Sequence, residues 1–160
     1  IYNSKLTIKM KTQFDVLRKS RELILEELDG LTLDQIHIIP LGFKNNIAWN
    51  VAHLVVTQQP LHYKLSGLNC LCPDDLIKAH TKGTFPTKIF TDQEFNEVKE
   101  LLVGLPDTLE EDFDAGIFKE YKAYPSSTGF VIDSFESALV FNNFHEGIHY
   151  GIVRSIKKFL

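Results

Sequence analysis

Apolar residues recur at helical spacing in four long segments of this chain, and this periodicity restricts the fold more than any other feature. The segments cover residues 11–28, 45–67, 91–105 and 133–159. Along the first segment, the apolar residues that share one helical face are Phe14, Leu17, Ile24, Leu25 and Leu28. No stretch alternates apolar and polar residues over the length of a useful strand. The sequence therefore predicts an all-α protein.

Capping residues mark the ends of these helices. Gly30 ends the first helix, because glycine is favoured just beyond a helix C-terminus. Capping boxes, in which an N-cap residue precedes Glu or Gln by three positions, are expected at Thr32-Gln35, Thr91-Glu94 and Asp133-Glu136. They predict a short turn at residue 32 and helix starts at residues 91 and 133.

Proline and glycine are expected to disturb two of the helices. Pro60 lies inside the second segment and predicts a kink or a local break, because proline lacks the backbone donor of a helical hydrogen bond. Gly104 and Pro106 are expected to interrupt the third helix, with Pro106 beginning a second short piece.

Two long connections join the helices. Residues 67–90 contain no regular pattern beyond a turn near residues 73–79, and this connection could span up to roughly 80 Å when extended. A 20-residue helix is only about 30 Å long. The second and third helices therefore need not be antiparallel neighbours, and a four-helix bundle with a long crossover is expected. The second connection, residues 116–132, is also expected to be irregular.

The chain of 160 residues suits one domain. Met10 is the only methionine, and the first helical pattern follows it directly. We therefore expect residues 1–9 to be an N-terminal extension and residues 10–160 to form a single domain.

Composition argues against nucleic-acid and membrane partners. The net charge is −4 and the Lys and Arg residues are scattered, whereas nucleic-acid binding needs a concentrated basic face. No apolar run approaches the about 18 residues of a membrane-spanning helix. Cys70 and Cys72 lie too close in the chain for an unstrained disulfide and are expected to be reduced, which predicts a cytoplasmic protein.

His145 and His149 lie four positions apart in the last helical segment, within the pattern H-E-x-x-H. At this spacing both imidazoles point the same way from a helix and can bind one metal ion. The extended zinc-peptidase signature needs a third histidine six positions later, where this chain has Ser155. A third ligand is therefore expected upstream, and the best candidate is His53.

Each of these signals has a plainer interpretation when taken alone. His53 is flanked by apolar residues and would on its own be an ordinary buried histidine, and an i,i+4 histidine pair also arises by chance on helix surfaces. Two helices that each carry histidine near mid-length favour a metal site. His37, His62 and His80 have no matched partner and are expected on the surface or in loops.

Glu146 follows the first histidine of the pair and has two interpretations. On an ideal helix it is rotated by about 100° from His145, so it is either solvated or paired with a neighbouring helix. In H-E-x-x-H zinc enzymes the same glutamate acts as a general base. Glu146 is therefore a candidate catalytic residue.

Three segments together resemble the DinB-like (damage-inducible) superfamily: residues 46–54 (NIAWNVAHL), 83–86 (GTFP) and 144–151 (FHEGIHYG). The resemblance implies a four-helix bundle in up-down-down-up order with the long crossover at 67–90. It implies a homodimer and a divalent metal ion bound by His53, His145 and His149. Characterised relatives include S-transferases and isomerases that use low-molecular-weight thiols.

We therefore expect a metal-dependent enzyme acting on a small molecule, either a thiol-dependent S-transferase or a hydrolase. The alternatives are a non-catalytic bundle that binds a metal or small ligand, and an interaction bundle whose histidines are incidental. Three histidines suit zinc, nickel, iron or copper. A pocket beside an open coordination position would favour the enzyme, and histidines that fail to converge would leave only the interaction bundle.

Overall fold

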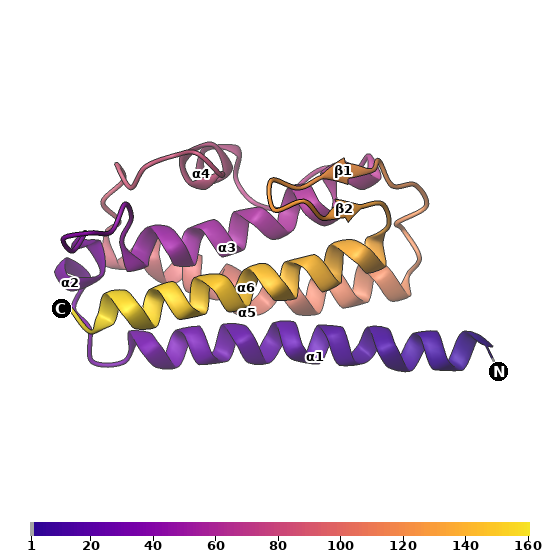
Figure 1. Cartoon of the computed structure of the whole chain (residues 1–160), viewed down its shortest axis with the longest axis horizontal. Helices are drawn as coiled ribbons and strands as arrows, with labels where there is room; N and C mark the ends of the chain where they lie inside the picture. Colours follow the sequence, from indigo (N-terminus) through magenta and orange to yellow (C-terminus); the bar gives the residue numbers. More distant parts are fainter. Residues whose placement is uncertain (1) are drawn as a thin grey trace.

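Four long helices form the frame of the computed structural model, which describes residues 2–160, with side chains from Met10 onward (Figure 1). They are α1 (Tyr2–Leu28), α3 (Ile47–His62), α5 (Asp92–Asp114) and α6 (Phe135–Lys157). Both α1 and α3 pack against α5 and α6. The helices α1 and α6 run in one direction, and α3 and α5 run in the other (Figure 1). The predicted all-α bundle with up-down-down-up order is therefore confirmed.

The connection between α3 and α5 carries the chain back along the bundle, so that these two helices run parallel. A short 3-10 turn, η1 (Lys64–Ser66), follows α3, and α4 (Asp74–His80) then packs against α3 on the outside (Figure 1). The long crossover expected from the sequence is present. It is more regular than expected, because α4 stands where only a turn was predicted.

The first helix begins earlier than predicted, at Tyr2 instead of near Lys11. Residue 1 of the expected extension lies outside the described residues. Beyond α1, the helix α2 (Leu33–His37) opens with the predicted capping box of Thr32 and Gln35. The predicted box at the start of α5 is also present, whereas α6 is capped by Ser134 and not by Asp133.

The predicted interruption of the third helix is wrong, since α5 continues through Gly104 and Pro106, and α3 likewise continues through Pro60 without a break. A proline inside a helix costs about 3 kcal/mol. Burial of one leucine side chain contributes about 1.5–3 kcal/mol, and α5 buries three beside its proline: Leu102, Leu105 and Leu109. Their packing between helices outweighs the lost hydrogen bond.

Part of the second connection forms a small antiparallel hairpin that the sequence analysis did not predict. Its strands, β1 (Tyr124–Pro125) and β2 (Val131–Ile132), have two residues each, too few for an alternating pattern to show. The hairpin lies over the end of α3 and the start of α6 (Figure 1).

The interior of the bundle contains polar as well as apolar side chains. His62 and His80, expected on the surface or in loops, are only 0% and 2% exposed, so that prediction is wrong for both. The Nδ1 of each ring donates to the backbone carbonyl one helical turn earlier, which allows the ring to be buried. Burial lowers the pKa of His62 to about 4 and keeps it neutral. Within residues 2–160, none of the helices combines the length and the apolar composition needed to cross a membrane.

Candidate metal centre

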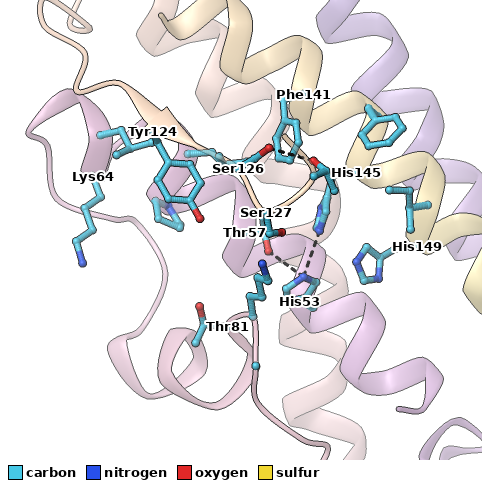
Figure 2. Close-up of a pocket in the computed structure, with 18 of the residues that line it drawn as sticks. His53, Thr57, Lys64, Thr81, Tyr124, Ser126, Ser127, Phe141, His145 and His149 are labelled. Carbon is cyan, nitrogen blue, oxygen red and sulfur yellow. Dashed lines mark hydrogen bonds between the residues drawn. The ribbon is translucent and has the colours of Figure 1, made fainter. Parts of the chain in front are cut away.

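Three histidines from two helices meet where α3 faces α6 (Figure 2). His53 comes from the middle of α3, and His145 and His149 come from successive turns of α6. One nitrogen of each ring lies within 4.8 Å of the others. The structure thus brings together all three of the candidate ligands that the sequence indicated.

Hydrogen bonds from Nδ1 orient two of the three rings. His53 Nδ1 donates to the carbonyl oxygen of His80 at 2.6 Å, and His149 Nδ1 donates to the side-chain oxygen of Asn50 at 2.7 Å. The Asn50 amide is itself fixed, because its Nδ2 donates to Asn45 Oδ1 and to a backbone carbonyl. A proton on Nδ1 leaves the lone pair on Nε2, which is the form of imidazole that binds a metal ion.

The third ring, His145, is held differently. It stacks on Phe141 with ring centroids 6.4 Å apart, and its Nδ1 is buried without a hydrogen-bond partner among the described residues. Its Nε2 lies 3.3 Å from the Nε2 of His53, which carries a lone pair. Such a contact requires either a proton on His145 Nε2 or a cation between the two nitrogens. The donor set of three converging imidazole nitrogens therefore fits a divalent metal ion.

Trp49 covers one face of this histidine cluster. Its ring stacks on His53 with centroids 4.5 Å apart and an interplanar angle of 10°. Its Nε1 donates to Thr84 Oγ1 at 3.1 Å, and Thr84 in turn donates to the carbonyl of Thr81. These contacts connect the crossover to α3 and hold the Trp49 ring against one side of the cluster.

Burial keeps the three imidazoles neutral. Loss of solvent lowers the pKa of His145 to about 3 and that of His149 to about 2, with smaller contributions from the neighbouring histidines and, for His145, from Arg21. The pKa of His53 is also lowered, again mainly by burial. Protons therefore do not compete for the ring nitrogens near neutral pH, which favours metal binding.

Glu146 lies between the two α6 histidines in sequence but faces away from them. Its side chain is 0% exposed and accepts hydrogen bonds from Arg21 of α1 at 2.9 and 3.2 Å and from Asn142 at 3.2 Å. It is not among the residues that line the pocket beside the histidines. Of the interpretations made from the sequence, the geometry favours pairing with a neighbouring helix.

A pocket of about 650 Å³ opens beside the three histidines. The helices α3 and α6 form its base, and residues 81–83 of the crossover and 124–128 of the hairpin form its rim (Figure 2). Three lysines that the sequence did not indicate also line it, Lys64, Lys82 and Lys122. They come from η1, from the crossover beyond α4 and from the segment between α5 and β1, and no local pattern marks them.

Asn50→Ala is expected to weaken metal binding about 10- to 100-fold, the usual effect of removing a group that orients a ligand. Without the Asn50 oxygen, the Nδ1 proton of His149 loses its acceptor and the ring is free to rotate. Calorimetric titration with Zn²⁺ measures the effect. Asn143→Ala, which removes only contacts with Gln13, is the matched control and should bind as the unchanged protein does. Equal affinity of the two variants would contradict the role given to Asn50.

Comparison with curated proteins finds no match. The family model described as the DinB superfamily matches residues 17–153, a range that contains all three histidines and parts of all four bundle helices. The match covers most of the chain, and the fold and the order of the histidines agree with the resemblance noted in the sequence. The chain therefore belongs to the DinB superfamily.

Proposed function

We propose that His53, His145 and His149 bind one divalent metal ion and that the pocket beside them is the active site of a metal-dependent enzyme. The observation that carries the proposal is the convergence of three neutral ring nitrogens at the wall of an open pocket. Three protein ligands with space for a further one is the arrangement of catalytic metal sites, whereas structural sites are closed by four protein ligands. Zinc, nickel and iron all accept such a donor set.

When bound, the metal supplies Lewis acidity, which lowers the pKa of a thiol or of water and favours the nucleophilic form. The residues of the chain orient the ligand rings and form the surroundings of the site. The carbonyl of His80 and the amide of Asn50 hold two rings in one tautomer. Thr57, whose hydroxyl is 3.3 Å from His53 Nε2, offers a hydrogen-bonding group to a substrate atom at the same place.

The proposed reactions are the transfer of a low-molecular-weight thiol to a small electrophile, or hydrolysis. The pocket volume of about 650 Å³ falls within the roughly 300–1,000 Å³ of small-molecule sites. Trp49 and Phe141 form aromatic walls near the cluster, and we expect these walls to limit the access of water. Limited water access favours the transferase, because a reactive electrophile is then protected from hydrolysis.

Metal binding is tested with protein purified without a histidine tag and treated with a chelator. Elemental analysis and calorimetry should find one Zn²⁺, Ni²⁺ or Fe²⁺ per chain, and saturation at about 100 times Kd should stabilise the fold by about 2.7 kcal/mol. A variant with all three histidines replaced by alanine should bind none. Retention of the metal by that variant would contradict the site.

Catalysis is tested separately on the metal-loaded protein, with low-molecular-weight thiols plus a chlorodinitrobenzene electrophile, and with small esters and amides. Turnover that disappears with the metal would support the enzyme. Tight metal binding without turnover of either class would favour the alternative, a non-catalytic metal- or ligand-binding bundle.

The proposed assembly is a homodimer that pairs through an exposed apolar stripe of α6 at the edge of the pocket. Val140, Phe144 and Ile148 recur at turn spacing in this stripe and are 53%, 47% and 40% exposed, and Phe144 and Ile148 also line the pocket. The ring of Phe130 extends the apolar surface, 5.5 Å from that of Phe144. A symmetric dimer would cover this stripe with its own copy.

Light scattering at micromolar concentration should therefore give twice the chain mass of 18.3 kDa. Val140→Asp should yield monomers, because a carboxylate would be buried in the interface. Val16→Asp, at an exposed position of α1, is the matched control and should remain dimeric. A monomeric unchanged protein would contradict the proposal. For the location, we expect the cytoplasm, since both cysteines are free thiols.

A further inference from the structure

The charges around the pocket differ from those of the chain as a whole. The chain has 21 acidic and 17 basic residues, with a net charge of −4. The described residues that line the pocket include Lys64, Lys82 and Lys122, but no aspartate or glutamate. A cleft lined by one sign of charge concentrates ligands of the opposite sign. Positive charge is therefore gathered at the pocket beside the histidines.

The lysines come from three parts of the chain that only the fold brings together. Lys64 belongs to η1, Lys82 lies in the crossover beyond α4, and Lys122 precedes β1. All three are exposed, and no ion pair is recorded for any of them within the described residues. Their ammonium groups are free to bind a ligand.

Hydroxyl groups lie beside the lysines. Thr81 is next to Lys82 in the chain, and Ser127 and Tyr124 belong to the hairpin; Figure 2 shows all three around the pocket that also contains Thr57 and His53. Hydroxyls donate hydrogen bonds to anionic oxygens. The rim therefore combines positive charge with neutral donors.

The deeper wall has a different character. Leu61 from the end of α3, Leu65 from η1 and Phe141 from α6 also line the pocket. They offer apolar surface, which favours burial of a hydrocarbon or aromatic group. The pocket is thus divided into a cationic mouth, an apolar wall and the histidine cluster.

We propose that the ligand of this pocket is an amphipathic small anion, which carries a carboxylate or a phosphate on an apolar body. The lysines and rim hydroxyls hold the anionic group, and the leucines and Phe141 hold the body. This proposal names the substrate class of the site in the proposed function. The interpretation of the bound anion as a substrate therefore rests on that function. The anion binding itself requires no metal ion.

Trp49 provides the readout, because it is the only tryptophan of the chain and lines the pocket. Metal-free protein is titrated with four probes that share a phenylalkyl body: 4-phenylbutyrate, 2-phenylethyl phosphate, 4-phenylbutanol and 4-phenylbutylamine. Calorimetry supplies a second measurement of affinity. We expect both anions to change the Trp49 fluorescence and to bind more tightly than the alcohol, and the amine to bind most weakly. The ratio of the affinities for the two anions shows whether the pocket prefers a carboxylate or a phosphate.

A pair of variants distinguishes the effect of the pocket lysines on anion affinity from the effect of net charge. The pocket variant carries Lys64→Gln, Lys82→Gln and Lys122→Gln, and the control carries the same change at three lysines outside the pocket, Lys11, Lys99 and Lys158. The pocket variant should lose about two- to fivefold in anion affinity per lysine, as exposed ion pairs do, and should keep its affinity for the alcohol. The control should keep both affinities.

Three results would overturn the proposal: no response to either anion, equal affinity for anion and alcohol, or equal losses in the two variants. Because these titrations use metal-free protein, their outcome is independent of the metal titration. Anion binding without metal binding would reject the proposed metal enzyme and keep the ligand class. Metal binding without anion preference would reject the ligand class alone.

Discussion

His149→Ala is expected to weaken metal binding by more than about 100-fold, which exceeds the usual effect of removing only an orienting group. Two imidazoles would remain, and they come from different helices. Activity that depends on the metal should disappear. The fold should survive, because α6 is held by buried apolar residues on the same helix, among them Leu139, Val153 and Ile156.

Calorimetric titration with Zn²⁺ and elemental analysis measure this effect, and circular dichroism during heating reports the fold. His37→Ala is the matched control, since His37 is a histidine outside the cluster, bonded to the backbone of Phe90. It should retain one metal ion per chain. If His149→Ala binds Zn²⁺ as tightly as His37→Ala does, the three-histidine site is wrong.

The second large effect is expected at the buried ion pair of Arg21 and Glu146. Their side chains are 1% and 0% exposed, and Arg21 also donates to the carbonyls of Leu102 on α5 and Leu54 on α3. This single guanidinium therefore contacts the other three helices of the bundle. Glu146→Ala leaves a buried charge without its partner, which should lower the free energy of unfolding by about 3–5 kcal/mol.

Replacing both residues by methionine should restore most of that loss, because the charge and its partner are removed together. Urea denaturation of Arg21→Met, Glu146→Met and the double variant measures the coupling between the two residues. The matched control is the more exposed pair of Arg154 and Glu27, which also joins α1 to α6, at 3.1 Å, with side chains 56% and 21% exposed. Glu27→Gln should cost less than about 1 kcal/mol.

A further variant, Glu146→Gln, decides between the two interpretations of Glu146. A general base would lose activity in Glu146→Gln while the stability stayed close to that of the unchanged protein. A residue that stabilises the bundle would lose stability, and activity would follow the folded fraction. We expect the second result, since the carboxylate faces α1 and not the pocket. Stable but inactive Glu146→Gln protein would show that the catalytic interpretation is correct.

Features that depend on residues close in the chain were predictable from the sequence. The helical segments follow from apolar periodicity, and two capping boxes form where Thr32 and Thr91 indicated them, because each needs only four consecutive residues. The i,i+4 spacing of His145 and His149 likewise fixes the direction of both rings. His53 was identified through its matching place on another helix, which required one assumption about how the helices pack.

Features that depend on packing were decided only by the tertiary structure. The burial of Leu102, Leu105 and Leu109 carries α5 through Pro106, although the local propensity favours an interruption. The partner of Glu146 lies 125 positions away in the chain, on α1. No local pattern could have shown that this residue faces an arginine and not the histidine cluster.

The pocket shows the same division most clearly. Its histidines come from helices that the apolar periodicity of the sequence reveals, so the cluster could be predicted. Its lysines come from two connections, the one from α3 to α5 and the one that leads from α5 into a hairpin with strands of two residues. Helical spacing, with one assumption about packing, indicated the three candidate ligands, whereas only long-range packing determined the charge around them, because a connection carries no periodic signal of where it will lie.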